Sequence, residues 1–100
     1  MQWHNVSTRF MFMIPKTAGV YMITVGNQVV YVGQATDLKT RIQQHFLDSE
    51  TNSDLKNVIK RYQVSVMFAE VAHVSELNRL ESELYYKYNP VCNQIAPPRY

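Results

Sequence analysis

The chain has 100 residues, which is enough for one domain with its own hydrophobic core. Hydrophobic residues make up 46% and charged residues 18% of the sequence, which excludes a disordered chain. No apolar run approaches the roughly 20 residues that cross a bilayer. The net charge of +2 permits nucleic-acid binding without indicating it, because dedicated DNA-binding proteins carry a larger basic surplus.

The cysteine content and the sequence organisation indicate the cellular setting and the number of domains. Cys92 is the only cysteine, so no internal disulfide can form, and a reducing, cytoplasmic (intracellular) setting is expected. The first residues do not form a basic region followed by an apolar run, so they are not expected to act as a signal peptide. With no repeat, low-complexity tract or Gly/Ser linker, we predict a single domain over residues 1–100.

The first third of the chain predicts a β-hairpin. Residues 9–14 form an apolar run that ends at Pro15, and either a short strand or a docked N-terminal arm would explain it. Residues 19–25 are rich in β-branched and aromatic types and are predicted to form a strand. Gly26-Asn27 is typical of a turn, and residues 28–33 form the second predicted strand.

The rest of the chain predicts three helices and one more strand. Helices are expected from Asp37 to Leu47, from Asp54 to Lys60, and from a Ser75 cap to about Tyr88, before Asn89-Pro90. Residues 62–72 alternate as a third strand. The order β-β-α-α-β-α predicts an α/β protein of the α+β type, with a small three-stranded antiparallel sheet packed with helices.

The last helix has a carboxylate among apolar positions. The angular positions around the helix axis, at about 100° per residue with Leu77 at zero, are about −20° for Leu84, about 40° for Glu81 and about 80° for Tyr85. A carboxylate among core positions must be paired, hydrogen-bonded or bound to a metal, because burying it alone costs several kcal/mol. Two alternatives follow for Glu81: a buried salt bridge with an Arg or Lys, or a metal-binding or catalytic role.

The first helix has two functional candidates beside its buried stripe. Arg41 and His45 are stacked neighbours at i and i+4, on the border of the stripe that contains Leu38 and Ile42. The alternative for Arg41 is a solvated residue on the flank of the helix. The alternative for His45 is a hydrogen-bonded histidine at the edge of the core.

Several motifs together resemble a known family. They occur in the order Gly19-Val20-Tyr21, Tyr31-Val32-Gly33, Arg41, Glu81, Pro90 and Asn93. Any one of them is weak, but the set, in this order and spacing, resembles the GIY-YIG endonucleases, including the nuclease domains of excision-repair and homing endonucleases. The resemblance extends from about Pro15 to Asn93 and implies a GIY-YIG nuclease-like core over about residues 15–93.

The resemblance implies a metal-dependent endonuclease that hydrolyses phosphodiester bonds in DNA, with RNA as an alternative substrate. One divalent ion, Mg²⁺ or Mn²⁺, would be held by Glu81, and Arg41 would bind the scissile phosphate. Tyr21 would orient or deprotonate the attacking water, with Tyr31 in the same pocket. Since a tyrosine of ordinary pKa is a poor base, a nearby cation would have to lower the pKa of Tyr21.

Four further positions have implied roles. Gly33 would let the backbone approach the substrate, and Asn93 would support the site by hydrogen bonding. His45 corresponds to a histidine in some family members and would assist proton transfer or contact phosphate. Gln34 stands where many repair-type members have a lysine, which argues against any role that needs a charge there.

The two tyrosines also impose a condition on the hairpin. A two-residue turn would pair Val25 with Gln28 and would put Tyr21 and Tyr31 on opposite faces of the sheet. If both serve one pocket, Val25 must pair with Val29. We therefore predict a three-residue loop or an equivalent bulge.

Two rival interpretations and the question of specificity remain open at this stage. One rival is a module of the same fold that binds nucleic acid or a partner protein without cutting. The other is a structural domain with a buried ion pair between Glu81 and Arg41. Specificity is expected to come from a partner protein or separate domain, or from a preference for branched or damaged DNA; alternatively, the protein cuts with little selectivity. The alternatives for the pathway are repair, restriction, mobile-element transfer and defence.

Overall fold

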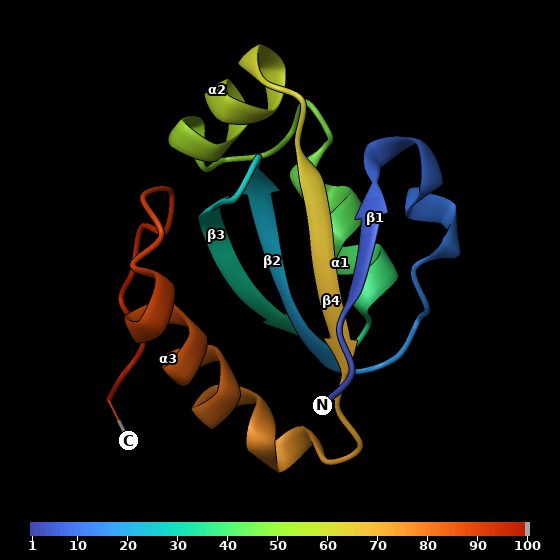
Figure 1. Cartoon of the computed structure of the whole chain (residues 1–100), viewed down its shortest axis with the longest axis vertical. Helices are drawn as coiled ribbons and strands as arrows, with labels where there is room; N and C mark the ends of the chain where they lie inside the picture. Colours follow the sequence, from blue (N-terminus) through green and yellow to red (C-terminus); the bar gives the residue numbers. More distant parts are fainter. Residues whose placement is uncertain (100) are drawn as a thin grey trace.

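A four-stranded antiparallel sheet organises the fold, in the spatial order β1-β4-β2-β3 (Figure 1). The computed structural model describes residues 1–99. The elements in chain order are β1 (His4–Ser7), the 3₁₀ helix η1 (Thr8–Met13), β2 (Gly19–Val25), β3 (Gln28–Ala35), α1 (Leu38–His45), α2 (Ser53–Arg61), β4 (Ser65–Glu70), the 3₁₀ helix η2 (Val74–Glu76) and α3 (Leu77–Tyr88).

The α+β class is confirmed, but the predicted number of three strands is wrong. The additional strand is β1, which pairs antiparallel with β4 from His4 opposite Phe68 to Ser7 opposite Ser65. Its four residues have no apolar alternation, so only the free edge of β4 determines that they form a strand. Residues 9–14 form most of η1 rather than a strand, and the run docks through Ile14, whose side chain is 2% exposed.

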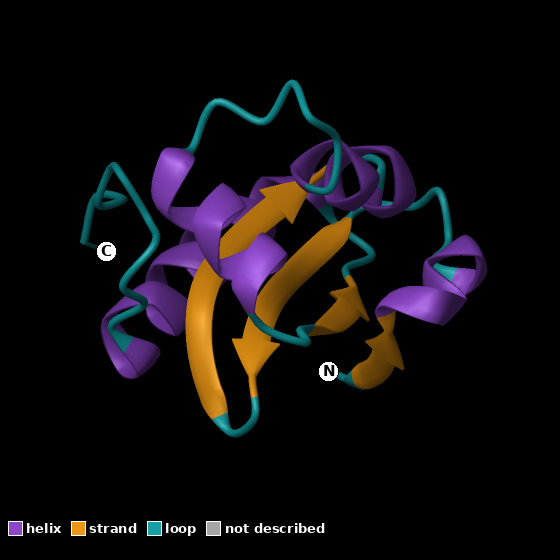
Figure 2. Ribbon diagram, turned by 90° about the horizontal axis from the view of Figure 1, so that it is seen from above, coloured by secondary structure: helices purple, strands orange, loops and turns teal. Residues whose placement is uncertain are grey.

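Helices cover both faces of the sheet (Figures 1 and 2). On one face, Tyr21 of β2 packs in a cluster with Leu38 and Ile42 of α1. On the other face, Val20 of β2 packs with Leu77 of α3. Burial of β2 on both faces explains why its sequence is almost continuously apolar.

The hairpin between β2 and β3 combines a tight turn with a bulge. Val25 pairs with Gln28 across Gly26-Asn27, where Gly26 has a φ of 58° that favours glycine. The predicted three-residue loop and the pairing of Val25 with Val29 are therefore wrong. The alternative, a bulge, is confirmed, because the register shifts between Ile23 and Thr24.

The bulge brings the two tyrosines to the same face of the sheet. After the shift, Ile23 pairs with Tyr31 and Tyr21 pairs with Gly33. One additional residue in β3, Val30, reverses the alternation that a tight turn alone would impose. The rings of Tyr21 and Tyr31 are consequently stacked, with centroids 6.2 Å apart.

The helix termini follow local capping rules in two of three cases. Asp37 caps α1 by accepting from the N–H of Thr40, and Asn52 caps α2 in the same way. The predicted Ser75 cap is wrong, because η2 precedes α3 and no side-chain cap bond forms there. Asn89, with a φ of 50°, ends α3. Within residues 1–99, no helix is both long and apolar enough to cross a membrane.

Candidate active site

A pocket opens where the free edge of β3 meets α1, α3 and the C-terminal segment. Because β3 is an edge strand, side chains from the two faces of the sheet can approach one another beyond it. Five residues predicted from the sequence are in this pocket. Its lining consists of Tyr31, Arg41, His45, Glu50, Thr51, Asn52, Glu81, Asn93, Gln94 and Ile95.

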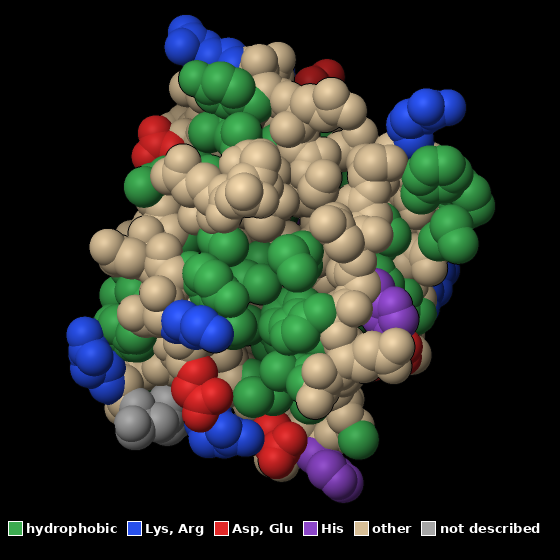
Figure 3. Space-filling model, viewed as in Figure 1, with side chains coloured by type: hydrophobic (Ala, Val, Ile, Leu, Met, Phe, Trp, Pro, Cys, Tyr) green, Lys and Arg blue, Asp and Glu red, His purple; other side chains and the backbone are tan. Residues whose placement is uncertain are grey.

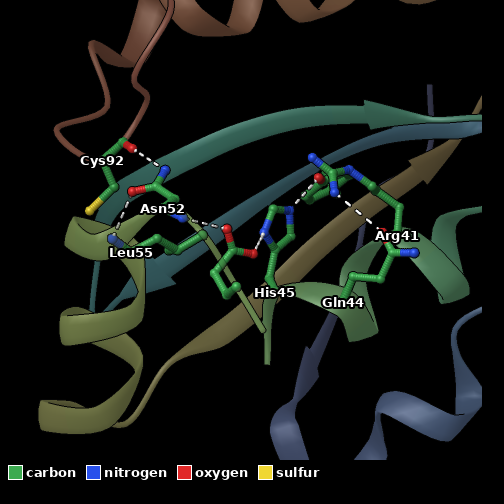
Figure 4. A network of polar contacts seen from close by, with 8 residues as sticks. Arg41, Gln44, His45, Asn52, Leu55 and Cys92 are labelled. Atoms are coloured by element: carbon green, nitrogen blue, oxygen red, sulfur yellow. Dashed lines mark hydrogen bonds and ion pairs between the residues drawn. The ribbon is translucent and has the colours of Figure 1, made fainter. Parts of the chain in front are cut away.

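A chain of hydrogen bonds runs behind the pocket wall (Figure 4). The hydroxyl of Tyr21 lies 2.7 Å from Nε2 of His45, and Nδ1 of His45 lies 2.8 Å from a carboxylate oxygen of Glu50. The second carboxylate oxygen of Glu50 accepts from the backbone N–H of Asn52 at 2.9 Å. His45, which the sequence left as either a core-edge or a functional residue, thus connects β2 to the α1–α2 loop.

The pKa shifts of these groups indicate a neutral imidazole and a neutral phenol. Burial lowers the pKa of His45, with Glu50 acting in the opposite direction. Burial would raise the pKa of Glu50, but hydrogen bonds from Asn52 and His45 outweigh it and the pKa is lowered. Burial, together with Tyr31, raises the pKa of Tyr21 well above its usual value. A neutral imidazole has one ring N–H, so His45 can donate to only one of its two partners, Tyr21 and Glu50.

The two tyrosines differ in their access to the pocket. Tyr21 is 0% exposed and is not in the lining, whereas Tyr31 is half-buried and borders the pocket. The ring of Tyr31 meets that of His45 edge-on at 4.8 Å between centroids. The expectation that a cation lowers the pKa of Tyr21 is not met by Arg41, because its effect is smaller than that of burial.

Gly33 has a packing role that the sequence did not predict. It is buried directly opposite Tyr21 in the sheet, and a Cβ atom at this position would overlap Cζ and the hydroxyl of the tyrosine. Glycine is therefore required for the ring of Tyr21 to lie across β3 and reach His45.

Glu81 projects from α3 into the pocket, as its place in the apolar stripe suggested. It is half-buried, and burial raises its pKa while Gln34 and Arg41 act in the opposite direction. The side-chain amide of Gln34 donates to Oε1 of Glu81 at 3.3 Å and also to Asn78. Gln34 thus orients the carboxylate without adding a charge.

The donor set at Glu81 fits one hard divalent ion that retains its water. Among residues 1–99 no group of three or more His, Cys, Asp or Glu side chains converges. Oε2 of Glu81 accepts no hydrogen bond from the described side chains, and it remains available as a ligand. One carboxylate oxygen with waters and a substrate phosphate is a coordination pattern that Mg²⁺ accepts.

Arg41 is exposed on α1 and reaches the same pocket. Its described hydrogen bond goes to Oε1 of Gln44 at 3.3 Å, and within residues 1–99 it forms no ion pair. The alternative of a buried ion pair between Glu81 and Arg41 is therefore wrong. An exposed guanidinium at a pocket is free to bind a phosphate through two parallel hydrogen bonds.

Asn93 closes the free edge of β3. Its side chain accepts from the N–H of Val32 and donates to the C=O of the same residue, both at 2.9 Å. The N–H of Cys92 donates to the C=O of Val30 at 2.8 Å. These bonds give the C-terminal segment a fixed position beside the pocket.

The structure adds Glu50 and Asn52 to the site. Asn52 could have been identified as the cap of α2 from its position before Ser53-Asp54. Glu50 had no such signal, since it lies in a polar loop with no periodicity and meets His45 only after the loop folds back.

Comparison with known proteins identifies the family. Residues 17–95 match the family model described as the GIY-YIG catalytic domain. The chain belongs to the GIY-YIG family. Its two name-giving tripeptides are Gly19-Val20-Tyr21 and Tyr31-Val32-Gly33, which lie on the paired strands β2 and β3.

Relatives and solved structures of GIY-YIG proteins agree with this assignment. UvrABC system protein C of Fusobacterium nucleatum subsp. nucleatum is 31% identical over 80 residues, which are 80% of this chain and 13% of the relative. The protein of the same name from Fervidobacterium nodosum is 32% identical over 82 residues, 82% of this chain and 14% of the relative. The chain therefore spans about one seventh of the length of these relatives.

Among solved structures, the N-terminal GIY-YIG endonuclease domain of UvrC from Thermotoga maritima, bound to magnesium as its catalytic divalent cation, has the same fold. The TM-score is 0.72 at 21% identity, over 85% of this chain and 92% of that chain. A mutant of EndoII from bacteriophage T4 has a TM-score of 0.61 at 16% identity, over 78% of this chain and 74% of that chain.

Proposed function

We propose that this GIY-YIG domain is a metal-dependent endonuclease that hydrolyses phosphodiester bonds in DNA. The observation that carries the proposal is the convergence on one pocket of the half-buried carboxylate of Glu81, the exposed guanidinium of Arg41 and the imidazole of His45. Phosphodiester hydrolysis needs an activated water, stabilisation of negative charge on phosphorus and a group that accepts a proton. Glu81, through a bound ion, and Arg41 would stabilise the charge, and His45 would accept the proton of the water.

Glu81 would hold Mg²⁺ or Mn²⁺ through Oε2, with Gln34 keeping the carboxylate in place through Oε1. When bound, the ion supplies Lewis-acid stabilisation of the scissile phosphate and of the leaving oxygen. Arg41 binds a non-bridging phosphate oxygen and stabilises the charge that grows there in the transition state. Asn93 keeps the edge of β3 closed to other strands and keeps the pocket wall rigid.

The proton of the attacking water would pass through Tyr21 to His45. Tyr31, which borders the pocket, would hold the water by a hydrogen bond. The hydroxyl oxygen of Tyr21 keeps a lone pair for a proton donor while its own proton goes to Nε2 of His45. Because Tyr21 is fully buried, contact with water requires a small displacement of the side chains that cover it.

Substrate selection depends on more than the pocket. On the face seen in Figure 3, Lys and Arg side chains stand apart from one another, and some adjoin acidic side chains. That face offers little of the continuous phosphate contact that gives DNA-binding proteins their affinity. We propose that a partner protein or a separate domain supplies specificity to a nuclease core at about residues 15–93.

The test is cleavage of plasmid, single-stranded, flapped and branched DNA, and of one RNA, with Mg²⁺ or Mn²⁺. Glu81→Gln should reduce cleavage at least about 100-fold, because the amide cannot replace a charged ligand. Glu83→Gln is the matched control, since Glu83 is on the same helix, exposed and paired with Arg79 at 2.7 Å. Circular dichroism verifies that both variants are folded.

Two outcomes would contradict the proposal. Equal cleavage by wild type and Glu81→Gln would show that the activity does not use this carboxylate. Absence of cleavage on every substrate, with nucleic acid still bound, would instead support a binding module of the same fold.

A further inference from the structure

We propose that Glu50 is a positioning residue of the nuclease: its carboxylate fixes the Nδ1–H tautomer of His45, so that Nε2 faces the hydroxyl of Tyr21 as a proton acceptor. The inference rests on the proposed function and names a residue that the family motifs of this chain do not contain. Its basis is the geometry of the hydrogen-bond chain behind the pocket (Figure 4).

Both carboxylate oxygens of Glu50 are engaged. Oε2 lies 2.8 Å from Nδ1 of His45, and Oε1 accepts from the N–H of Asn52 at 2.9 Å. The two side chains of the pair are 1% and 9% exposed, for His45 and Glu50 respectively. With both oxygens bound and little water access, the carboxylate has one orientation.

Asn52 anchors this orientation to two other parts of the fold. Its side chain caps α2 by accepting from the N–H of Leu55, and it donates to the C=O of Cys92 at 2.7 Å. The loop between α1 and α2 is therefore attached to α2 and to the C-terminal segment that closes β3. The position of Glu50 is determined by tertiary contacts as well as by its own loop.

A carboxylate can only accept, so the ring nitrogen that faces it must carry a hydrogen. A neutral His45 with hydrogen on Nδ1 has a lone pair on Nε2, which lies 2.7 Å from the hydroxyl of Tyr21. The other tautomer would leave two acceptors facing each other at Glu50, and Nε2–H would donate to the hydroxyl oxygen of Tyr21 instead of accepting its proton. Glu50 thus determines which way the proton of Tyr21 can move.

A purely structural pair is the competing explanation. If His45 and Glu50 formed a static ion pair, the imidazole would carry hydrogen on both nitrogens and Tyr21 would accept from Nε2. The two cases differ in the protonation of Nε2. That difference can be measured without any cleavage assay.

The experiment combines NMR with kinetics on the full chain. Long-range ¹H–¹⁵N spectra of ¹⁵N-histidine-labelled protein at neutral pH report the state of each ring nitrogen of His45 in wild type, Glu50→Gln and Glu50→Asp. The same proteins are assayed for DNA cleavage with Mg²⁺, with Glu83→Gln as the control. Thermal unfolding and circular dichroism establish that each protein is folded.

We expect hydrogen on Nδ1 alone in wild type and a mixture of tautomers in Glu50→Gln, because an amide can donate or accept. The kcat of Glu50→Gln should fall about 10- to 100-fold, the usual effect of removing the group that orients a functional imidazole, with KM changed less than about 3-fold. Glu50→Asp keeps the carboxylate, so it should retain the wild-type tautomer and recover part of the rate. If Glu50→Gln does not fold, the spectra of wild type and Glu50→Asp still show whether Nδ1 of His45 carries the hydrogen.

Three results would overturn the inference. They are an imidazolium in wild type at neutral pH, hydrogen on Nε2 alone in wild type, and a folded Glu50→Gln that cuts within about 2-fold of wild type. Failure of the proposed function gives a different result, because the wild-type protein then cuts no substrate and Glu50 can have no role in the rate. If wild type cuts and Glu50→Gln cuts equally well, only the proposed role of Glu50 is excluded.

Discussion

The ring of Tyr21 lies across the backbone of Gly33, its partner in the neighbouring strand, in the space that any Cβ atom there would take. Even Cε1 of the ring is only 2.8 Å from that position. The bulge at Val30 creates this pairing, because it shifts the register between the turn and Ile23. Glycine at position 33 and the orientation of Tyr21 toward His45 are therefore one structural requirement.

Gly33→Ala should displace the ring of Tyr21. We expect a loss of about 1–3 kcal/mol in the free energy of unfolding, the usual cost of overpacking a core, and cleavage reduced at least about 10-fold. Urea unfolding and the cleavage assay measure the two effects. Gly26→Ala is the control: its positive φ makes alanine cost about 1 kcal/mol, but its Cβ would meet open space, so cleavage should persist.

Tyr21→Phe removes the hydroxyl that is hydrogen-bonded to Nε2 of His45 and keeps the ring. Leaving a buried ring nitrogen without a partner should lower the unfolding free energy by about 1–3 kcal/mol. Cleavage should fall about 10²- to 10⁴-fold if the hydroxyl carries the proton of the water. Tyr62→Phe, on an exposed tyrosine, should change neither quantity. Wild-type cleavage by folded Tyr21→Phe would exclude the tyrosine from the proton path.

Arg41→Ala should separate activity from stability. Because Arg41 is exposed and bonds only weakly to Gln44, the unfolding free energy should change by less than about 0.5 kcal/mol. Cleavage should fall at least about 100-fold, and Arg41→Lys should recover only part of it, since an ammonium lacks the two-pronged geometry. Arg61→Ala, in the last turn of α2, is the matched control. A marked loss of stability in Arg41→Ala would contradict the described surroundings.

Asn93→Ala should loosen the free edge of β3. Two hydrogen bonds to Val32 are lost, and we expect a decrease of about 1–2 kcal/mol in unfolding free energy. Hydrogen exchange of the Val32 amide should become faster, because water replaces the side-chain acceptor. Gln94→Ala, at an exposed neighbour, should leave that exchange rate unchanged. Unchanged exchange in Asn93→Ala would mean that the contact is not maintained in solution.

Acid should destabilise the fold through His45. Burial lowers its pKa below the ordinary value of 6.5, so the unfolded chain takes up this proton first as the pH falls. Stability present above about pH 6.5 is then lost as the pH falls through the lowered pKa. Glu50, whose pKa is also lowered despite its burial, adds a loss of the same sign below about pH 4.5.

Urea unfolding at pH values from 7 to 4 measures this effect. Glu81 acts in the opposite sense, because its pKa is raised by burial and its protonation favours the folded state. The comparison is therefore made in Glu81→Gln protein. Adding His45→Gln should flatten the decline between about pH 6.5 and 5, whereas His73→Gln, at an exposed histidine, should not. A decline unaffected by His45→Gln would locate the acid sensitivity elsewhere.

Some of this site could be predicted because the relevant information is local. Helical periodicity alone placed Glu81 within an apolar stripe, and spacing four placed Arg41 beside His45. The requirement that Tyr21 and Tyr31 share a face predicted a three-residue loop or an equivalent bulge, because strand alternation excludes a tight turn alone, and the bulge is the form that occurs. The capping of α1 and the end of α3 near Asn89 follow from side chains close in sequence.

The sequence by itself determined the α+β class and the hairpin and named the candidate site residues, because periodicity, turn chemistry and motif spacing can be read along the chain. Only the tertiary structure decided that His4–Ser7 form a strand, since a free edge of β4 supplies their partners. It alone decided that Glu50 meets His45 and that Tyr21 is sealed from the pocket. Hydrogen-bond partners and burial depend on which surfaces come into contact when the chain folds, and no local sequence pattern specifies those tertiary contacts.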